Sequence, residues 1–472
     1  MNDRREFLKT FVIGSAGLAL MPQLAFGQAK SAWDTVYPQI LSRIKPPKFP
    51  KRDFKITNFG AVADGKTDCT AAFAKAIDAC NKAGGGRVVV PKGEFLTGAI
   101  HLKSNVNLHI SKGATVKFSQ DEKQYLPLVF SRWEGMECMN YSPFIYAFEQ
   151  SNIAITGEGT LDGQSDHTHW WYWKGQKEHG WKEGMPNQRA GRAKLYKMMD
   201  DGVPVKDRVF GPESYLRPQF IQPYKCKNVL IEGVTILRSP MWEVHPVLCE
   251  NVTVRKLRIS THGPNNDGCN PESCKDVLIE NCYFDTGDDC IAIKSGRNAD
   301  GRRLNIPTEN IIVRGCIMKD GHGGITVGSE ISGGVRNLFA ENCRMDSPDL
   351  WTALRVKNNA SRGGKLENFY FRNITVGQVS KAVVEIDFNY EEGQKGGHIP
   401  VVRNYVVEGL TCETANRAVD LQGFDNAPIY EVTMRNCTFG TVKNPSIVKN
   451  VRGIKLDNVK VGGKVVSELV RN

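Results

Sequence analysis

The sequence of 472 residues carries 62 Lys and Arg against 51 Asp and Glu, which gives a formal net charge of +11. A chain of this length can bury a large core, either in one elongated domain or in two compact ones. The basic residues are dispersed and no recognition motif accompanies them, which argues against nucleic acid and favours an anionic partner of another class.

The first 29 residues have the pattern of a twin-arginine signal peptide. Arg4-Arg5 lies within Asp3–Lys9, an apolar run follows over 10–20, and small residues suitable for cleavage occur over 25–29. The alternative, a membrane anchor, needs about 18 apolar residues, which neither this run nor any later segment supplies. We therefore expect export by the twin-arginine route, to the periplasm or beyond the cell. A basic exported protein suits an acidic polysaccharide as its partner.

The chain then changes from irregular to regular. Residues 30–53 are rich in Pro and Lys and predict a linker that lies over the surface. A helix is predicted over 67–80, where apolar residues recur at helical spacing, and the glycines at 84–86 would end it. We expect this helix to cover the N-terminal end of one catalytic domain over residues 54–472.

After this helix, one short strand pattern repeats along the chain. Each copy opens with a turn residue, usually Asn, and continues with alternating apolar residues. The copies begin at Asn152, Asn228, Asn251, Asp276, Asn310, Asn337, Asn368, Asn404, Glu431 and Gly453. The shortest spacings are 22 (453 − 431) and 23 (251 − 228) residues, too short for strands that alternate with helices. The pattern predicts an all-β fold, a right-handed parallel β-helix in which each copy forms one coil.

Stacked coils place equivalent residues about 4.8 Å apart, and this explains the cysteines. Cys282, Cys316, Cys343 and Cys437 share one repeat position, where other coils carry Val, Leu or Ile. We expect them to be small buried apolar residues and not metal ligands. The odd total of 13 Cys and their spacing also argue against a disulfide framework.

The interval between the copies at Asn152 and Asn228 is about 50 residues longer than a coil needs. It holds four of the eight tryptophans, mixed with lysines: Trp170, Trp171, Trp173 and Trp181 with Lys174, Lys177 and Lys182. We interpret it as one wall of a sugar-binding cleft, with rings that stack on sugar faces. The alternative is packing against the flank of the β-helix or against another subunit.

Position within the repeat tests whether polar residues meet. Asp288 lies 12 residues into its coil (288 − 276) and His322 lies 12 into the next (322 − 310), so they should be neighbours. Asp267 can reach the same column through an extra turn, and a bend near Gly287 would let both Asp288 and Asp289 face solvent.

Two basic residues complete this cluster. Arg355 and Lys357 lie on the following coil, and their i, i+2 spacing puts them on one face. An acidic turn or a basic strand face is weak evidence by itself, because each is more often ordinary solvated surface. Their convergence over four consecutive coils is specific.

The chain resembles the polygalacturonases of glycoside hydrolase family 28 over roughly residues 54–460. Four motifs occur in the family's order: Asn265-x-Asp267, Gly287-Asp288-Asp289, Gly321-His322-Gly323 and Arg355-x-Lys357. One departure is Asn266, where the family usually has Thr. The resemblance implies hydrolysis of α-1,4-galacturonosyl linkages with inversion, with no metal or cofactor. The intact carboxylate set and basic pair favour galacturonate over the substrates of rhamnogalacturonan hydrolases.

The resemblance also implies a role for each residue. Asp288 would be the general acid, Asp267 and Asp289 would hold and deprotonate a water, and His322 would tune Asp288. Asn265, Arg355 and Lys357 would bind substrate, the last two through its carboxylate. An inverting pair is typically about 6.5–9.5 Å apart, and crowding should raise the pKa of at least one carboxyl group.

Three other functions stay open at this point: a Ca²⁺-dependent pectate lyase on the same fold, a galacturonidase acting on rhamnogalacturonan ends, and a non-catalytic sugar-binding β-helix. We favour exo-action for the hydrolase. The long insert and the segment 131–135, which resembles sequence in exo-acting relatives, could close one end of the groove.

Overall fold

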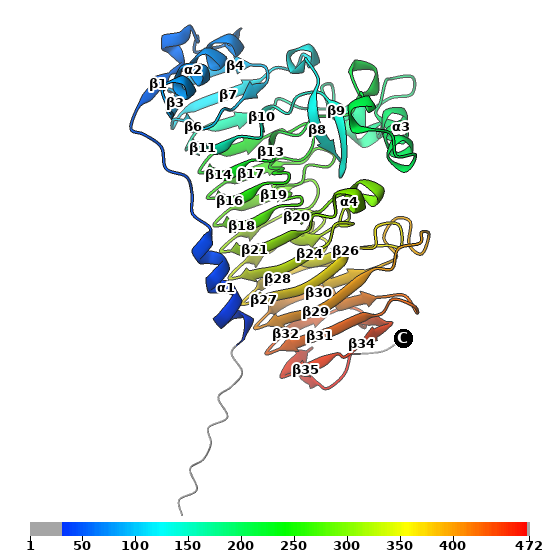
Figure 1. Cartoon of the computed structure of the whole chain (residues 1–472). Coiled ribbons are helices and arrows are strands. Elements are labelled where there is room, and N and C mark those ends of the chain that lie inside the picture. The colour runs from blue at the N-terminus through cyan, green and yellow to red at the C-terminus, as the bar shows by residue number, and fades with distance from the viewer. Residues whose placement is uncertain (1–30, 470–472) are drawn as a thin grey trace, which may run out of the picture.

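The computed structural model describes residues 31–469, and three parallel sheets wind through them into a right-handed β-helix (Figure 1). Each coil contributes one strand to each sheet, and the next coil stacks on it in parallel register. The fold predicted from the repeat is therefore confirmed. Among these residues, no helix has the length and apolar character needed to cross a bilayer.

The strands of the three sheets are as follows. The first sheet contains β1 (Asp53–Lys55), β3 (Gly86–Val90), β6 (Val106–Ile110), β11 (Ser151–Gly157), β14 (Lys227–Glu232), β16 (Glu250–Arg255), β18 (Lys275–Glu280), β21 (Thr308–Arg314), β24 (Val335–Glu341), β27 (Lys365–Arg372), β29 (Val401–Glu408), β31 (Ile429–Arg435), β34 (Val451–Arg452) and β35 (Lys455–Asp457). The second contains β2 (Asp64–Asp68), β4 (Gly93–Thr97), β7 (Ala114–Phe118), β12 (Thr160–Asp162), β15 (Thr235–Leu237), β17 (Arg258–Thr261), β19 (Tyr283–Thr286), β22 (Ile317–Met318), β25 (Arg344–Met345), the first parts of β28 (Thr375–Asp387) and β30 (Thr411–Gln422), β32 (Thr438–Val442) and β36 (Val459–Val461), with β37 (Lys464–Val466) antiparallel at its end. The third contains β5 (Ile100–His101), β10 (Ile145–Phe148), β13 (Ile221–Tyr224), β20 (Ile291–Ile293), β23 (Ile325–Val327), β26 (Leu354–Lys357), the last parts of β28 and β30, and β33 (Ile447–Lys449).

The turn residue that opens each repeat has a physical reason. Asn228, Asn251, Asn310 and their equivalents have φ values near +60°, a left-handed conformation that Asn tolerates better than most residues. Their side chains also bond from coil to coil: Asn251 donates to Asn228 over 2.7 Å, and Asn337 donates to Asn310 over 3.0 Å. The amide ladder fixes the register of the first sheet.

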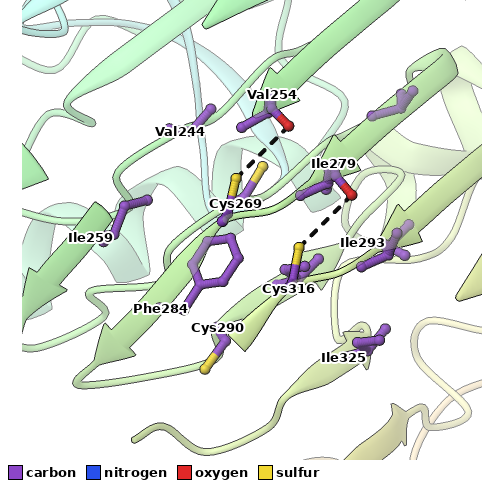
Figure 2. Close-up of a cluster of buried hydrophobic side chains, with 14 of the residues drawn as sticks. Val244, Val254, Ile259, Cys269, Ile279, Phe284, Cys290, Ile293, Cys316 and Ile325 are labelled. Atoms are coloured by element: carbon purple, nitrogen blue, oxygen red, sulfur yellow. Dashed lines mark hydrogen bonds between the residues drawn. The ribbon is translucent and has the colours of Figure 1, made fainter. Parts of the chain in front are cut away.

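The interior of the coils is apolar and close-packed. All thirteen cysteines are buried and free, which confirms their prediction as small core residues. Figure 2 shows Cys269, Cys290 and Cys316 among Val and Ile side chains of neighbouring coils.

The cap of the N-terminal end is helix α2 (Thr70–Lys82), close to the predicted range. It packs on β1, β3 and β6 and buries the expected apolar residues, among them Phe73 and Ile77. The chain before Thr70 differs from the predicted helix, because residues 64–68 form β2, although the N–H of Thr70 donates to Asp68 Oδ1 over 2.9 Å.

The predicted linker at 30–53 is wrong in its first half, because helix α1 (Ala32–Arg43) lies along the outside of the first sheet (Figure 1). Trp33, Tyr37 and Ile40 point to the sheet at helical spacing. They cover outward-facing apolar residues of successive strands, Leu278, Ile312 and Phe339, which would otherwise face water. The predicted signal peptide at 1–29 lies outside the described residues.

Insertions between coils build a rim on one side of the β-helix. They contain the antiparallel hairpin of β8 (Val129–Trp133) and β9 (Met136–Asn140), the helices α3 (Arg189–Asp200) and α4 (Asn298–Leu304), and the 3₁₀ turn η3 (Trp171–Lys174). Figure 1 shows β8, β9, α3 and α4 on the same side of the stack. Shorter 3₁₀ turns are η1 (Ile56–Phe59), η2 (Glu122–Tyr125), η4 (Lys177–His179), η5 (Val205–Asp207) and η6 (Pro212–Ser214).

Candidate active site

A cavity of about 340 Å³ opens where the coils turn from the second sheet into the third. The seven residues predicted from the sequence all line it: Asn265, Asp267, Asp288, Asp289, His322, Arg355 and Lys357. Asp267 and Asp289 each lie two residues before paired positions of the third sheet, Cys269 and Ile291, so parallel register alone makes them neighbours.

The three carboxylates form one compact cluster. One oxygen from each of Asp267, Asp288 and Asp289 lies within 4.8 Å of the others. The separation of about 6.5–9.5 Å expected of an inverting pair refers to whole carboxyl groups and stays a prediction. The side chain of Asp288 is 17% exposed, whereas those of Asp267 and Asp289 are 4% and 1% exposed. The bend at Gly287 is present, but only Asp288 reaches solvent through the cavity.

Asp288 is held by the histidine of the next coil, as the repeat position predicted. Its Oδ1 lies 2.9 Å from Nδ1 of His322. The imidazole in turn stacks on Trp351, with ring centroids 3.8 Å apart. Trp351 lines the cavity. The ammonium group of Lys381 also lies over its ring, 3.7 Å from the ring centroid. The sequence analysis did not identify Trp351, because nothing in the repeat marks it.

Asp289 is held from the opposite side. Lys357 Nζ donates to its Oδ2 over 2.6 Å and Thr326 Oγ1 donates to its Oδ1 over 3.0 Å. Arg355 instead bonds Glu385 over 2.7 Å and lies 4.0 Å from Asp289. The basic pair therefore shares a face as predicted, but both cations are already engaged by carboxylates of the protein.

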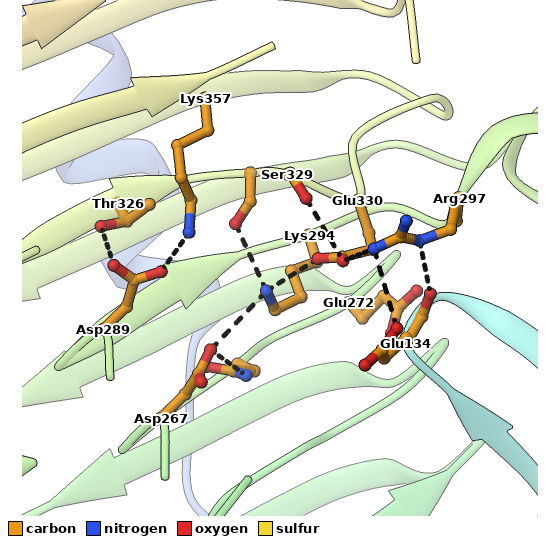
Figure 3. Close-up of polar contacts among 12 residues, drawn as sticks. Glu134, Asp267, Glu272, Asp289, Lys294, Arg297, Thr326, Ser329, Glu330 and Lys357 are labelled. Carbon is orange, nitrogen blue, oxygen red and sulfur yellow. Dashed lines mark hydrogen bonds and ion pairs between the residues drawn. The ribbon is translucent and has the colours of Figure 1, made fainter. Parts of the chain in front are cut away.

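Asp267 is held by a buried cation that the sequence analysis missed. Lys294 Nζ lies 3.6 Å from its Oδ2 and 2.8 Å from Glu330, and Asn270 donates to Asp267 over 2.9 Å. Figure 3 shows how Lys294 joins Asp267 to Glu330, which bonds Arg297 at the N-terminus of α4. Lys294 lies six residues after Asp288, at a repeat position that is buried. A charged residue at such a position was the signal in the sequence that could have identified it.

Burial and charge separate the carboxyl groups electrostatically. Burial, with the negative charge of Asp288, raises the pKa of Asp267 well above its usual range. For Asp288 burial acts in the same direction, but the hydrogen bond and charge of His322, with Lys357 and Lys294, hold its pKa below the usual range. Burial and a neighbouring charge thus raise the pKa of one carboxyl group, as predicted, but that group is Asp267 and not Asp288.

The cluster is also the place where a divalent cation would bind, because three carboxylate oxygens converge there. Two ammonium groups compete for this position, Lys357 at 2.6 Å from Asp289 and Lys294 at 3.6 Å from Asp267. They balance the negative charge that would attract a metal ion.

The insertions between coils form the walls of the cavity, but two of their tryptophans do not have the predicted sugar-stacking role. Trp170 and Trp173 are buried against Tyr141 in the core, so the cleft interpretation of these rings is wrong and the packing alternative holds. The insert supplies cations instead, Lys174 of η3 and Arg192 of α3.

The hairpin tip closes the same side of the cavity. Glu134, between β8 and β9, lines the wall and bonds Arg192 over 2.8 Å. The hairpin is fixed to the solenoid by fully buried Arg132, whose guanidinium lies 3.2 Å from Glu272. The pair Arg132–Glu272 is fully buried, so breaking it would leave an unpaired charge, and this holds the hairpin in place.

Comparisons with known proteins agree on one family. The model of the glycosyl hydrolases family 28 matches residues 212–461, and a model described as rhamnogalacturonase A/epimerase, pectate lyase-like, matches 54–119. The structure of a hyperthermoactive exopolygalacturonase from Thermotoga maritima is 46% identical, covering 92% of this chain and 97% of that one, with a TM-score of 0.89. An exo-poly-alpha-D-galacturonosidase of Dickeya chrysanthemi is 28% identical over 79% of this chain and 65% of its own length. An endo-polygalacturonase of Pectobacterium parmentieri is also 28% identical, over 79% of this chain and 84% of its own.

The contact between His322 and Asp288 predicts a measurable change in protonation. Replacement His322→Phe keeps a ring on Trp351 but removes the hydrogen bond and the positive charge, so the pKa of Asp288 should rise by about 1–3 pH units. Carboxyl ¹³C titration in aspartate-labelled protein measures it. The matched control is His262→Phe. His262 lies 3.0 Å from Asp285, a carboxylate that does not line the cavity. An unchanged Asp288 titration in His322→Phe would contradict the electrostatic role given to this pair.

Proposed function

Because this chain belongs to glycosyl hydrolase family 28, we propose that it is a polygalacturonase that hydrolyses α-1,4-galacturonosyl linkages of pectic polygalacturonate from the chain end. The observation that carries the proposal is the cluster of Asp267, Asp288 and Asp289, set in a cavity whose walls are lined with Lys and Arg. Carboxylates supply acid and base for glycoside hydrolysis, and the cations suit a polyanionic substrate.

The proposed acid is Asp288, because it alone of the three extends into the open cavity. The proposed bases are Asp267 and Asp289. A water that donates two hydrogen bonds of about 2.8 Å at a tetrahedral angle spans oxygens about 4.6 Å apart, which fits their separation within 4.8 Å. The cluster can therefore hold the attacking water between Asp267 and Asp289.

The directions of the pKa shifts of Asp267 and Asp288 match the protonation that hydrolysis leaves behind. After hydrolysis, the acid has given its proton to the leaving oxygen and the base has taken one from water. The directions of the pKa shifts favour the same state, in which Asp288 is ionised and Asp267 is protonated. The site is reset when the proton moves from Asp267 to Asp288, a distance that one water can bridge.

Two features favour hydrolysis over Ca²⁺-dependent elimination. Lys357 and Lys294 occupy the space around the carboxylates that a calcium ion would need. Burial opposes the charge of Lys357, but Asp289 keeps its pKa above the usual range, so this lysine stays protonated and cannot act as a base.

Exo-action is supported by the closed side of the cavity. Arg192 pairs with Glu134 over 2.8 Å, and Arg297 Nε donates to the carbonyl oxygen of Glu134 over 3.1 Å, which joins the hairpin, α3 and α4 into one wall across the groove. A polymer cannot pass a wall of fixed charges, so only a chain end fits beyond the cleavage site. The 46% identical relative is an exopolygalacturonase. We also propose that residues 1–29 direct twin-arginine export, so that the enzyme meets pectin of the plant cell wall outside the cytoplasm.

Product analysis on polygalacturonate tests both the reaction class and the mode of attack. Saturated galacturonic acid or its dimer should appear first, viscosity should fall slowly, and EDTA should leave the rate unchanged. Ultraviolet absorbance from an unsaturated uronide, abolished by EDTA, would identify a lyase. An early spread of mid-length oligomers with a rapid loss of viscosity would mean that the groove is open.

The role of Asp288 has its own test. Replacement Asp288→Asn removes only proton donation, so kcat should fall by about 10²–10⁴-fold while KM changes little. Asp285→Asn is the matched control, since this carboxylate lies three residues away and outside the cavity lining. Retention of a tenth or more of wild-type turnover in Asp288→Asn would exclude it as the acid.

A further inference from the structure

Most cations of the cavity are already neutralised by carboxylates of the protein. Each has a partner within 2.8 Å: Lys357 with Asp289, Arg355 with Glu385, Arg192 with Glu134, and Lys294 and Arg297 with Glu330. A substrate carboxylate that approached them would have to compete with these pairs. The cation that recognises a uronate is therefore better sought among those without a carboxylate partner.

Lys174, the last residue of η3, is such a cation. Its Nζ donates to Asn265 Oδ1 over 2.7 Å, and within residues 31–469 it forms no ion pair. An ammonium group has three N–H donors, so two are left for a ligand in the cavity that Lys174 lines. Burial lowers the pKa of Lys174, and the more distant charges of Glu134 and Asp288 offset this only in part.

Arg217 adds a second unneutralised charge behind Lys174. Its guanidinium is fully buried and donates only to neutral acceptors, to Gln188 and to the carbonyl oxygens of Pro240 and Pro264. It also donates to Asn265 Oδ1 over 2.9 Å, so both cations share one amide oxygen. Buried charges are normally paired, yet neither cation has an ion-pair partner among residues 31–469, and Glu134 and Asp288 act on both only from further away.

The place of these two cations matters for the reaction. The amide nitrogen of Asn265 donates to Asp288 Oδ2 over 3.4 Å. A carboxylate bound to Lys174 would therefore lie one side chain away from the proposed acid, on a sugar that adjoins the scissile bond. Asn265, predicted to bind substrate, uses its carbonyl oxygen to hold the two cations and its amide to hold Asp288.

We propose that Lys174, backed by Arg217, is the specificity-determining cation that receives the carboxylate of the hexuronate next to the scissile bond. This inference rests on the proposed function. Lys174 lies in the insert between coils and outside the four motifs, so the insert makes the cavity selective for an acidic sugar. Arg355 and Lys357, which also line the cavity, bond Glu385 and Asp289 in this structure.

The test compares an acidic substrate with its neutral form. Replacement Lys174→Met should lower kcat/KM for trigalacturonate by about 10- to 100-fold, the value of a charge-assisted hydrogen bond, while the rate on the fully methyl-esterified trimer stays within about twofold. The control is Lys177→Met, an exposed lysine of the same insert outside the cavity lining, which should change neither rate. Lys174→Arg should restore part of the preference for the acid.

Two outcomes would overturn the inference: an equal loss on both substrates, which marks a structural role, or no loss on the acidic substrate. Calorimetric binding of digalacturonate and of its methyl ester to wild type and to Lys174→Met separates this inference from the proposed function. If the wild type binds digalacturonate but does not hydrolyse polygalacturonate, the proposed function fails, and the binding difference still decides the role of Lys174.

Discussion

The site depends on the parallel register between neighbouring coils. Ile291, Ile325 and Leu354 pair in sequence along the third sheet, and this alone brings the Asp288 turn, the His322 turn and the basic pair of β26 side by side. A slip of one residue in any coil would turn the side chains of that coil to the opposite face. The amide ladder of the first sheet, with Asn at a left-handed position in most coils, opposes such a slip. Stability of the fold and geometry of the site therefore have the same cause.

The charged residues act as a second constraint on this frame. Three carboxylates within 4.8 Å would repel one another strongly in a buried place, and Lys294 and Lys357 offset that repulsion from two sides. The cost is that these cations are no longer free for substrate. The preference for an anionic sugar then has to come from elsewhere, and the insert between coils supplies Lys174 and Arg217 for it.

The repeat made much of this structure predictable, and insertions set the limit. Equal position in consecutive coils correctly brought Asp288 to His322, because the side-chain period of stacked strands is fixed. Residues from the insertions, such as Glu134 and Arg192, have no repeat position, and their places follow from buried ion pairs that the sequence does not display. Helix α1 was missed because the outward apolar residues that it covers read as ordinary strand residues. Trp170 and Trp173 misled for a related reason, since ring area serves a core as well as a ligand.

The claim that a compact carboxylate cluster performs single-displacement hydrolysis is tested most directly by the anomer formed first. The α-linked dimer of galacturonic acid is hydrolysed in an NMR tube, and the anomeric proton is recorded before mutarotation equilibrates the product. Direct attack by a water held between Asp267 and Asp289 predicts that the β-anomer appears first at the newly formed reducing end. Initial release of the α-anomer would contradict this account, because it would require a covalent intermediate on one of the three carboxylates.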